Sequence, residues 1–380
     1  MHTHHSVLCI TPPHMLQEIV RNGSSSQRDT ALRTLITSEQ MRGQRRVMKL
    51  MAAFMPAAAQ TGNKQRAIYD AKNGTQLPGT LVRSEGDPAS TDPAINEAYD
   101  GSGVTYDLYL DIYGRNSVDN NGLKLASTVH YQKGYDNAFW DGSQMVYGDG
   151  DEDLPVSERL FNRFTIALDI IAHELTHGVT QYEANLAYWD QSGALNESMS
   201  DVFGSLVKQY QRKQTAAQAD WIIGEGLFTP NIKGVGIRSM KAPGTAYDDP
   251  ILGKDPQPAH MKDYVRTVED NGGVHINSGI PNRAFYATAV ELGNYAWEKA
   301  GRIWYKTLTD KFQERATFQQ ACDLTFETAG EIYGANSFEQ QAVKKGWSEV
   351  GITVGGDAPS GCLSTILNAF GIKIKTQAVK

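Results

Sequence analysis

Apolar positions follow two different periods along this chain. Before residue 160 they alternate with polar positions in several short stretches, and Asn73-Gly74, a dipeptide typical of hairpin turns, separates the first two. Strands are therefore predicted at 67–69, 77–82, 104–110 and 125–131. From 160 to 178 and from 281 to 347 the apolar residues instead mark helical faces. The pattern predicts an α+β fold that is β-rich first and mainly helical afterwards.

The first 59 residues differ from the rest of the chain. Two helical patterns lie on either side of the polar stretch 22–26, and a run of small residues ends at Gln60. Pro12 and Pro13 are expected to hold the backbone extended, as in a peptide that lies in a cleft. The chain is therefore divided into an N-terminal segment (1–59), a β-rich part (60–160), a helical part (161–355) and a tail (356–380).

Composition narrows the class of protein. With 380 residues, of which 40% are hydrophobic, the chain is long and apolar enough to form a substantial core. A net charge of −7 argues against a nucleic-acid partner, and the three cysteines provide no disulfide framework. No apolar run approaches the roughly 20 residues of a membrane span, and residues 1–20 lack the features of a signal peptide. These features predict a globular protein that binds neither nucleic acid nor membrane.

The sequence His173-Glu174-Leu175-Thr176-His177 lies in the first predicted helix. Two histidines four residues apart share one helical face, so both imidazoles can reach one ion while Glu174 points at its open position. A catalytic zinc usually takes a third protein ligand from elsewhere. Glu197 and Asp201 are also four apart on a probable helix, so one carboxylate can bind the metal while the other orients a ligand histidine. Together the two segments predict a zinc hydrolase.

Residues 67 to 354 resemble the thermolysin family of zinc metalloendopeptidases. The likeness covers both metal segments, residues 137–140, 145–150 and 272–279. It implies a two-lobed protease, with a β-rich N-terminal lobe, a mainly helical C-terminal lobe and a zinc site between them. It also implies that the zinc ligands are His173, His177 and Glu197, a ligand set that is already known for thermolysin. A monomer that acts on peptide or protein substrates is expected.

The resemblance assigns catalytic roles to the residues that match. It implies that Glu174 takes a proton from the metal-activated water and later passes it to the leaving amine. Tyr188 and His275 match the residues that donate hydrogen bonds to the developing oxyanion. Asp201 and Asp270 are expected to orient the first metal-binding histidine and His275, respectively.

Five further residues match the substrate-binding positions of the family. Asn137 and Ala138 lie in the edge strand that pairs with an extended peptide, and Arg238 matches the arginine that binds the carbonyl beyond the scissile bond. Ile170 and Ile237 match the lining of the pocket just past that bond, which implies a preference for bulky apolar residues there.

The short N-terminal segment resembles the prosegment of the protealysin subgroup. The resemblance implies that residues around Cys9, Pro12 and Pro13 cap the active site until the segment is cut off. Self-cleavage is expected between Met48 and Gln60, where apolar and small residues lie together. Cys9 is either a thiolate ligand at the open zinc position or a small apolar side chain.

Calcium binding is doubtful, because the matching sites are altered. Lys208 and Ile222 stand where the family has carboxylates, and Val235 stands where it has an aspartate. The Lys208 ammonium can take the place of the cation beside the remaining acidic residues, which are Asp169, Asp220 and Glu225. Asp149 and Asp151 lie in a Gly-rich turn and are expected to be solvated rather than to bind calcium.

Two alternatives to a secreted, self-processing protease stay open. A non-catalytic zinc protein of the same fold would bind peptides without cutting them, although Glu174, Tyr188 and His275 are all present. A cytoplasmic protease with a specific protein target would agree with the missing signal peptide. The family resemblance favours secretion, by a route that the sequence does not reveal.

Overall fold

The computed structural model describes residues 8–52 and 63–356. Its main sheet has six strands, in the spatial order β1 (Leu8–Cys9), β5 (Ala138–Trp140), β6 (Met145–Tyr147), β4 (Leu125–Val129), β2 (Arg66–Asp70) and β3 (Thr80–Ser84). The helices of the first half are α1 (Pro13–Asn22), α2 (Ser25–Ala52) and α3 (Pro93–Tyr113). Single 3₁₀ turns, η1 (Val156–Glu158) and η2 (Phe164–Ile166), lead into the second half.

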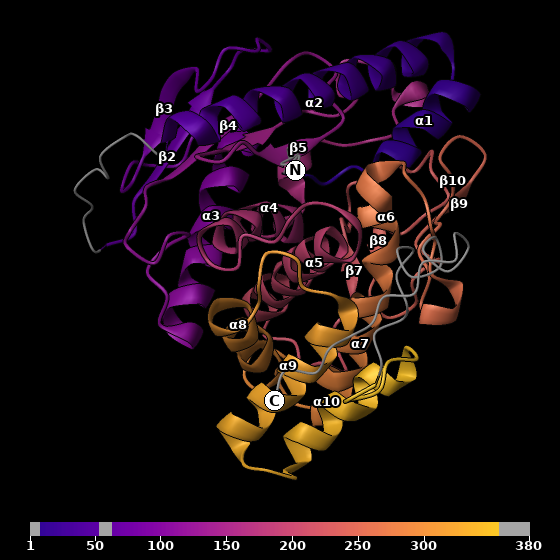
Figure 1. Cartoon of the computed structure of the whole chain (residues 1–380). Helices are drawn as coiled ribbons and strands as arrows, with labels where there is room; N and C mark the ends of the chain where they lie inside the picture. Colours follow the sequence, from indigo (N-terminus) through magenta and orange to yellow (C-terminus); the bar gives the residue numbers. More distant parts are fainter. Residues whose placement is uncertain (1–7, 53–62, 357–380) are drawn as a thin grey trace.

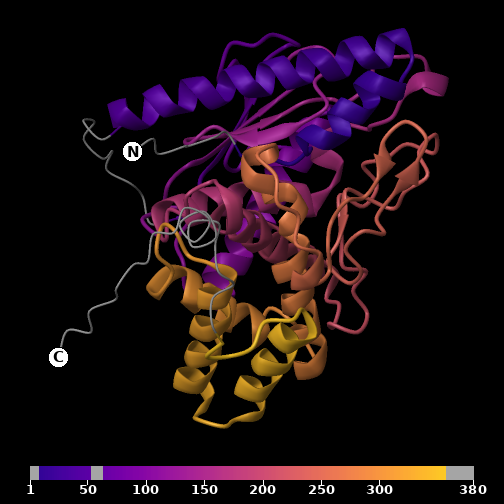
Figure 2. The same cartoon turned by 45° about the vertical axis from the view of Figure 1, so that its right-hand side comes forward.

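The second half is mainly helical. Its helices are α4 (Leu168–Tyr182), α5 (Asp190–Arg212), α6 (Asp270–Asn277), α7 (Gly279–Leu292), α8 (Ala300–Asp310), α9 (Phe318–Tyr333) and α10 (Phe338–Glu349). Between α5 and α6 lie two small sheets, β7 (Ile222–Ile223) with β8 (Arg238–Ser239) and β9 (Asp248–Asp249) with β10 (Gly253–Lys254), and a 3₁₀ turn, η3 (Met261–Asp263). Figures 1 and 2 show α2 along one side of the main sheet and α8 to α10 at the opposite end of the molecule. The predicted α+β fold is therefore confirmed.

The N-terminal segment supplies one edge of the main sheet. Strand β1 runs antiparallel to β5, with Cys9 opposite Phe139 and Leu8 opposite Trp140. Beyond the strand, Ile10 N donates to the carbonyl oxygen of the β5 residue at position 138 over 3.2 Å. This segment has therefore added a strand to the lobe that follows it in sequence.

Helix α3 corrects the sequence-based prediction of a strand at 104–110. The helix begins after Asp92, whose side chain caps it, and has Pro93 in its first turn, where proline is favoured. It ends at Gly114, which has the left-handed φ of +69°. Because α3 lies between the sheet and α4, both of its sides are buried, and its apolar residues no longer show a simple helical period.

The two helical patterns predicted in the N-terminal segment are confirmed as α1 and α2. The expected extended backbone at Pro12-Pro13 is only half right. Pro12 is extended, with φ of −65° and ψ of 141°, whereas Pro13 is the first residue of α1. Proline suits this position because the first helical residue needs no N–H partner and a φ near −65° is already helical.

Helices α4 and α5 pack closely against each other, which is what positions the site described below. At Gly204 of α5, a Cβ atom would lie 2.6 Å from the carbonyl oxygen of Asp169 in α4, so only glycine allows this approach. The helical pattern predicted from 281 to 347 is confirmed, and the structure divides it into α7 to α10. Within the described part of the chain, none of the helices has the length and apolar character needed to cross a membrane.

Candidate metal centre

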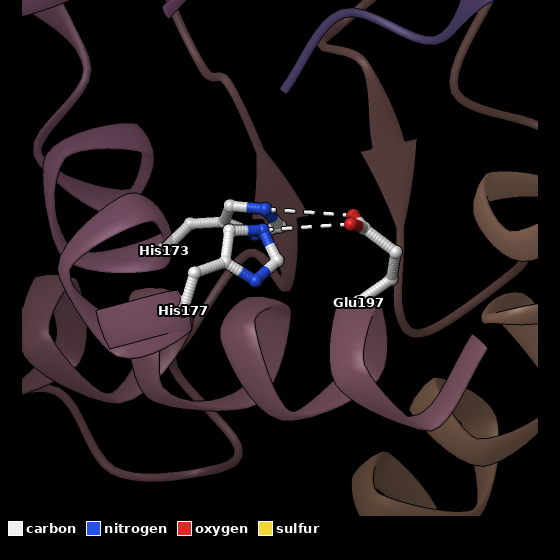
Figure 3. Close-up of side chains that lie close together, drawn as sticks. All are labelled: His173, His177 and Glu197. Carbon is white, nitrogen blue, oxygen red and sulfur yellow. Dashed lines mark ion pairs between the residues drawn. The ribbon is translucent and has the colours of Figure 1, made fainter. Parts of the chain in front are cut away.

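Two helices bring three potential metal ligands together. Helix α4 carries His173 and His177 one turn apart, and α5 presents Glu197 opposite them (Figure 3). Glu197 Oε2 lies 3.5 Å from His173 Nε2, and Glu197 Oε1 lies 3.4 Å from His177 Nε2. The three side chains are buried, and one ligand atom from each lies within 4.8 Å of the other two. This arrangement fits a single ion between them.

Hydrogen bonds behind the two imidazoles prepare them for a cation. His173 Nδ1 lies 2.8 Å from Asp201 Oδ1, and His177 Nδ1 lies 2.8 Å from Asn196 Oδ1. Because both oxygens are acceptors, each Nδ1 carries a hydrogen and each Nε2 turns its lone pair to the centre. Among the described residues, His173 Nε2 and Glu197 Oε2 are buried without a hydrogen-bond partner. Two nitrogens and a carboxylate are a donor set that zinc commonly takes.

Asn196 and Ser200 were missed by the sequence analysis. Ser200 Oγ lies 2.9 Å from His177 Nδ1, so this imidazole is held by two polar side chains of α5. Their spacing in the sequence does point to a shared role. Asn196 and Ser200 are four residues apart in α5, on either side of Glu197 in the sequence, and both are buried. Their spacing makes them candidates, but only the packing of α4 against α5 identifies them as partners of His177.

Asp201 connects the metal group to an arginine. Besides His173, its carboxylate accepts from Arg238 Nε over 2.8 Å, from Arg238 Nη2 over 2.7 Å and from Asn282 Nδ2 over 2.8 Å. Burial alone would raise the pKa of Asp201, but the Arg238 guanidinium and His173 outweigh burial and hold it below its usual range. The carboxylate therefore stays charged and fixes the orientation of both neighbours.

Glu174 lies beside the first histidine and points to strand β5. Its Oε2 accepts from the backbone N–H of Trp140 over 3.0 Å, and the side chain is fully buried. Gly178 allows α4 to approach the strand, because a Cβ there would lie 2.5 Å from Val118 and 3.1 Å from the Trp140 ring. The carboxylate is thus fixed without being part of the three-residue ligand group.

Tyr188 and His275 come together on the other side of the ligand group. Tyr188 OH donates to Glu197 Oε1 and lies 3.2 Å from His275 Nε2, which is itself 3.6 Å from Glu197 Oε2. Burial lowers the pKa of His275, but the carboxylates of Asp270 and Glu197 raise it more strongly. A hydroxyl and an imidazole N–H are therefore available as donors next to the centre.

A left-handed turn lets Asp270 hold His275 from behind. Asp270 Oδ1 lies 2.6 Å from His275 Nδ1, and Oδ2 accepts from the backbone N–H of His275 over 2.8 Å. Asn271, Gly272 and Gly273 all have positive φ, of 53°, 84° and 76°. The two glycines of the sequence adopt this conformation at little cost, which brings the aspartate back to the imidazole.

The residues predicted to bind substrate contact the N-terminal segment instead. Asn137 Oδ1 accepts from Thr11 N over 2.9 Å, and Ala138 O accepts from Ile10 N over 3.2 Å. Arg238 Nη1 donates to the carbonyl oxygen of Ile10 over 3.2 Å. An extended peptide thus lies beside the ligand group, and strand β5 and two side chains bind its main chain.

Cys9 contacts the residues around the metal ligands through its backbone rather than its side chain. His275 Nε2 donates to the carbonyl oxygen of Cys9 over 2.9 Å. The Cys9 side chain belongs to a buried apolar cluster with Tyr131, Tyr135, Phe139 and Val146, and it is not one of the grouped ligand residues. The structure therefore places Cys9 where the second alternative predicts it, among buried apolar and aromatic side chains.

Ile170 and Ile237 are both buried and belong to the same continuous apolar cluster as Ile10. His275 contacts the carbonyl oxygen of Cys9, which belongs to the Cys9–Ile10 peptide bond. The side chain of Ile10 is therefore the first one past that bond. All three isoleucine side chains are therefore part of the buried core.

Lys208 occupies the centre of the altered calcium region. Its Nζ lies 2.9 Å from Asp169 Oδ2, 2.8 Å from Asp220 Oδ1, 3.9 Å from Glu225 Oε2 and 2.6 Å from the carbonyl oxygen of Ile222. Burial lowers the pKa of this ammonium, but Asp169 and Asp220 raise it above its usual value. Arg212 Nη1 also lies 2.7 Å from Glu225 Oε2 and 3.4 Å from Asp220 Oδ2, so two cations of the chain itself pair with the acidic cluster.

Replacing Lys208 with methionine is expected to lower the free energy of unfolding by about 3 to 5 kcal/mol, because Asp169 would stay buried without its counter-charge. Thermal and urea denaturation measure this loss. Lys306→Met, which breaks an exposed ion pair with Asp310, is the matched control and is expected to change stability little. We also expect calcium to leave the melting temperature of the unmodified chain unchanged; a clear rise would show that a calcium site survives.

Comparisons with known proteins agree with this site. Family models described as thermolysin metallopeptidase, catalytic domain, and thermolysin metallopeptidase, alpha-helical domain, match residues 49–181 and 184–352. An extracellular metalloprotease of Pectobacterium carotovorum subsp. carotovorum is 51% identical over 354 residues, which cover 92% of this chain and 97% of that protein. Protease PrtS of Photorhabdus sp. (strain Az29) is 49% identical over 354 residues, covering 91% of this chain and 92% of its own.

A solved structure gives the same result. The precursor of protealysin, a metalloproteinase from Serratia proteamaculans, superposes with a TM-score of 0.81 at 53% sequence identity. The match covers 91% of this chain and 100% of that one. With family models across most of the chain and relatives at about half identity over nearly its full length, this protein belongs to the thermolysin family of zinc metallopeptidases, and within it to the protealysin-like subgroup.

Proposed function

We propose that this zinc metalloendopeptidase holds its metal with His173, His177 and Glu197 and is kept inactive by its own N-terminal segment. The observation that carries the proposal is the buried ligand group with Glu174 fixed beside it. When bound, zinc supplies a water whose pKa is lowered to about 7 and polarises the substrate carbonyl.

Glu174 is the proposed general base and acid. Its carboxylate is adjacent to the ligand histidines but leaves the coordination to them, so it is available to accept a proton from the attacking water. The same group then delivers that proton to the leaving amine. The hydrogen bond from Trp140 N holds the carboxylate in place for both steps.

Tyr188 and His275 are the proposed donors to the developing oxyanion. His275 already donates to a peptide carbonyl, that of Cys9, over 2.9 Å. The Tyr188 hydroxyl lies 3.2 Å from the same imidazole nitrogen. One such donor is typically worth about 3 to 4 kcal/mol of the barrier, because it is aimed in advance at the oxygen that gains charge.

The substrate is proposed to follow the path of the N-terminal segment. Asn137, Ala138 and Arg238 bind main-chain atoms of Ile10 and Thr11, as they would those of any extended peptide. Ile170 and Ile237 favour a bulky apolar side chain just past the cut bond. Full burial of such a side chain is worth about 1.5 to 3 kcal/mol, so bonds before leucine or isoleucine should be cut about 10- to 100-fold faster than bonds before alanine.

Cleavage of an unstructured protein substrate by the purified chain, with all products identified by mass spectrometry, tests this function. We expect cuts clustered before leucine, isoleucine and phenylalanine, and no cuts after treatment with a metal chelator until zinc is restored. Cuts without preference would contradict the proposed roles of Ile170 and Ile237. A zinc-loaded chain that binds the substrate but leaves it intact, also after residues 1–59 are removed, would indicate the non-catalytic alternative.

Residues 1–59 are proposed to form the inhibitory prosegment, which is cut off between Met48 and Gln60. Residues 60–160 and 161–355 are then the two lobes of the protease, and residues 356–380 are its tail. Cys9, with its carbonyl at His275, and Pro12-Pro13, which end the extended stretch and start α1, lie where a substrate would enter. A peptide substrate and this segment therefore compete for one cleft.

Substituting Ile10 with aspartate is expected to weaken this inhibition. The charged side chain would have to be buried in the apolar cluster that Ile10 now occupies, which costs several kcal/mol. We expect the variant to start cutting substrate sooner after purification, as followed with a fluorogenic peptide. The matched control is Ile36→Asp on the exposed face of α2, where the side chain is 49% exposed. Equal activation times for both variants and the unmodified chain would contradict the role of Ile10.

Action outside the cell is the proposed location. The relative from Pectobacterium carotovorum is named an extracellular metalloprotease, and the relative from Photorhabdus is named a protease. A precursor held inactive by its own segment also suits a protease that must not act where it is made. Detection of the processed form in the medium, rather than in the cell fraction, would support this location, and processed protein confined to the cell would favour the cytoplasmic alternative.

A further inference from the structure

Helix α2 of the N-terminal segment covers a second surface of the catalytic part, away from the metal centre. The backbone N–H of Asp136 donates to Thr34 Oγ1 over 3.1 Å, and Ser38 Oγ lies 3.1 Å from Tyr135 OH. Thr34 is fully buried by this contact. Helix α2 therefore lies directly against the residues just before strand β5, in the same N-terminal segment that contacts Arg238 and His275.

The contact buries a carboxyl group that has too few partners. Asp136 is 1% exposed, and its Oδ1 is a buried atom without a hydrogen-bond partner among the described residues. A second buried carboxyl group lies nearby, since Asp151 is only 1% exposed and interacts with Asp136. The prediction that Asp151, in the turn after β6, is solvated is therefore wrong. A charged carboxylate in this position would lose its water without gaining a replacement.

The charges around Asp136 do not compensate for that loss. Asp151 and Asp153 face it from the loop after β6, and Arg33 of α2 is the cation that faces it. Arg33 Nη2 donates to Thr30 Oγ1 over 3.2 Å. Burial first, and the two aspartates second, raise the pKa of Asp136 well above its usual range, although Arg33 opposes them.

The negative charges of Asp151 and Asp153 are themselves only partly compensated by hydrogen bonds or cations. Asp151 Oδ2 accepts the backbone N–H groups of Leu160 and Phe161 over 2.8 and 3.1 Å, and burial raises the pKa of Asp151 to about 6 in spite of these bonds. Asp153 has Lys133 as a partner, at 3.6 Å. Among the described residues, the charged groups that shift the pKa of Asp136 are Asp151, Asp153 and Arg33.

We propose that docking of helix α2 takes up a proton on Asp136, so that a rise in pH loosens the N-terminal segment from the catalytic part. The inference rests on the proposed role of this segment as a removable inhibitor and adds a trigger for its removal. An undocked Asp136 exposed to water would ionise in its ordinary range, near pH 4, whereas the docked carboxyl stays neutral to higher pH. Docking is therefore at full strength below the undocked pKa and weakens as the pH rises toward the docked one, by at most about tenfold per pH unit for one proton.

The test measures docking without any need for activity. In a full-length Glu174→Ala chain, which is expected to keep its segment, hydrogen exchange of the α2 amides at residues 28–40 is followed from about pH 5 to about pH 8 and corrected for intrinsic exchange. We expect protection to fall by up to about tenfold per pH unit. In Asp136→Asn, which has the same shape but no charge, protection should stay constant. A flat profile in the parent chain, or an equal fall in Asp136→Asn, would overturn the proposal.

Two further variants make the result specific. Asp29→Asn removes a carboxylate from the exposed side of α2 and should leave the pH profile of the parent unchanged. Arg33→Gln removes the cation that stabilises ionised Asp136 in the docked state, so the fall in protection should begin at the same pH but continue to higher pH. This readout holds even if Asp136→Asn does not dock. A fall that levels off at the same pH in Arg33→Gln as in the parent chain, or that disappears in Asp29→Asn, would count against Asp136 as the group that titrates. Because the parent chain is inactive, a failure here is distinct from a failure to find protease activity.

Discussion

Replacing Glu174 with glutamine is expected to reduce peptide hydrolysis by about 10²- to 10⁴-fold, the usual contribution of a positioned acid or base. Glutamine keeps the shape of the side chain and can still meet Trp140 N, but it cannot accept the proton of the attacking water. Since Glu174 is outside the ligand group, zinc content should not change. The measurements are kcat on a fluorogenic peptide and the zinc-to-protein ratio.

The mass of the purified chain gives a second readout for the same variant. If the segment is removed by self-cleavage, Glu174→Gln should keep residues 1–59 while the unmodified chain loses them. Glu183→Gln, at the end of the same helix, is the matched control, because Glu183 pairs with Arg115 and is not in the site. Activity above about a tenth of the unmodified rate, in a variant with full zinc content, would mean that another group is the base.

Replacing Asp201 with alanine is expected to lower both the free energy of unfolding and the affinity for zinc. Arg238 is 1% exposed and would lose the two hydrogen bonds that balance its charge, which typically costs about 3 to 5 kcal/mol when one partner of a buried pair is removed. His173 would also lose the acceptor at Nδ1, and loss of such a partner usually weakens metal binding by about 10- to 100-fold. Urea denaturation and competition with a zinc chelator measure the two effects.

A double variant separates these two effects. In Asp201→Ala combined with Arg238→Ala, the uncompensated charge is gone, so much of the stability should return. The zinc affinity should stay low, because His173 still lacks its partner. If the double variant is as unstable as the sum of the single ones, the ion pair is not the source of the loss; if it regains zinc affinity, His173 does not depend on Asp201.

Residues close in sequence made the metal group predictable. The histidines of the HExxH motif and the pair Glu197 and Asp201 are each four apart, and helical geometry alone puts such residues on one face. Asn196 and Ser200 are on the same helix, but nothing in a single sequence distinguishes a polar residue that holds an imidazole from one that faces solvent. Their role depends on the packing of α4 against α5.

Features that depend on distant segments could not be predicted. The alternation at 104–110 was interpreted as a strand because both sides of α3 are buried, one by the sheet and one by α4, and neither partner is adjacent in sequence. Asp151 was expected to be solvated because its Gly-rich turn is typical of a surface loop. Asp136 is sealed by a helix about 100 residues earlier in the chain. Burial of this kind is a property of the tertiary structure.

Strand β1 also determines how firmly the inhibitor is bound before and after a cut. While it is part of the chain, the segment competes for the cleft at an effective concentration on the order of millimolar, as a tethered ligand does. One cut between helix α2 and strand β2 leaves the contacts of β1 with β5 and His275, and that of Ile10 with Arg238, in place, but turns the proposed inhibitor into a separate molecule. Its occupancy then follows its concentration in solution, so dilution into a large volume completes the activation and makes it irreversible.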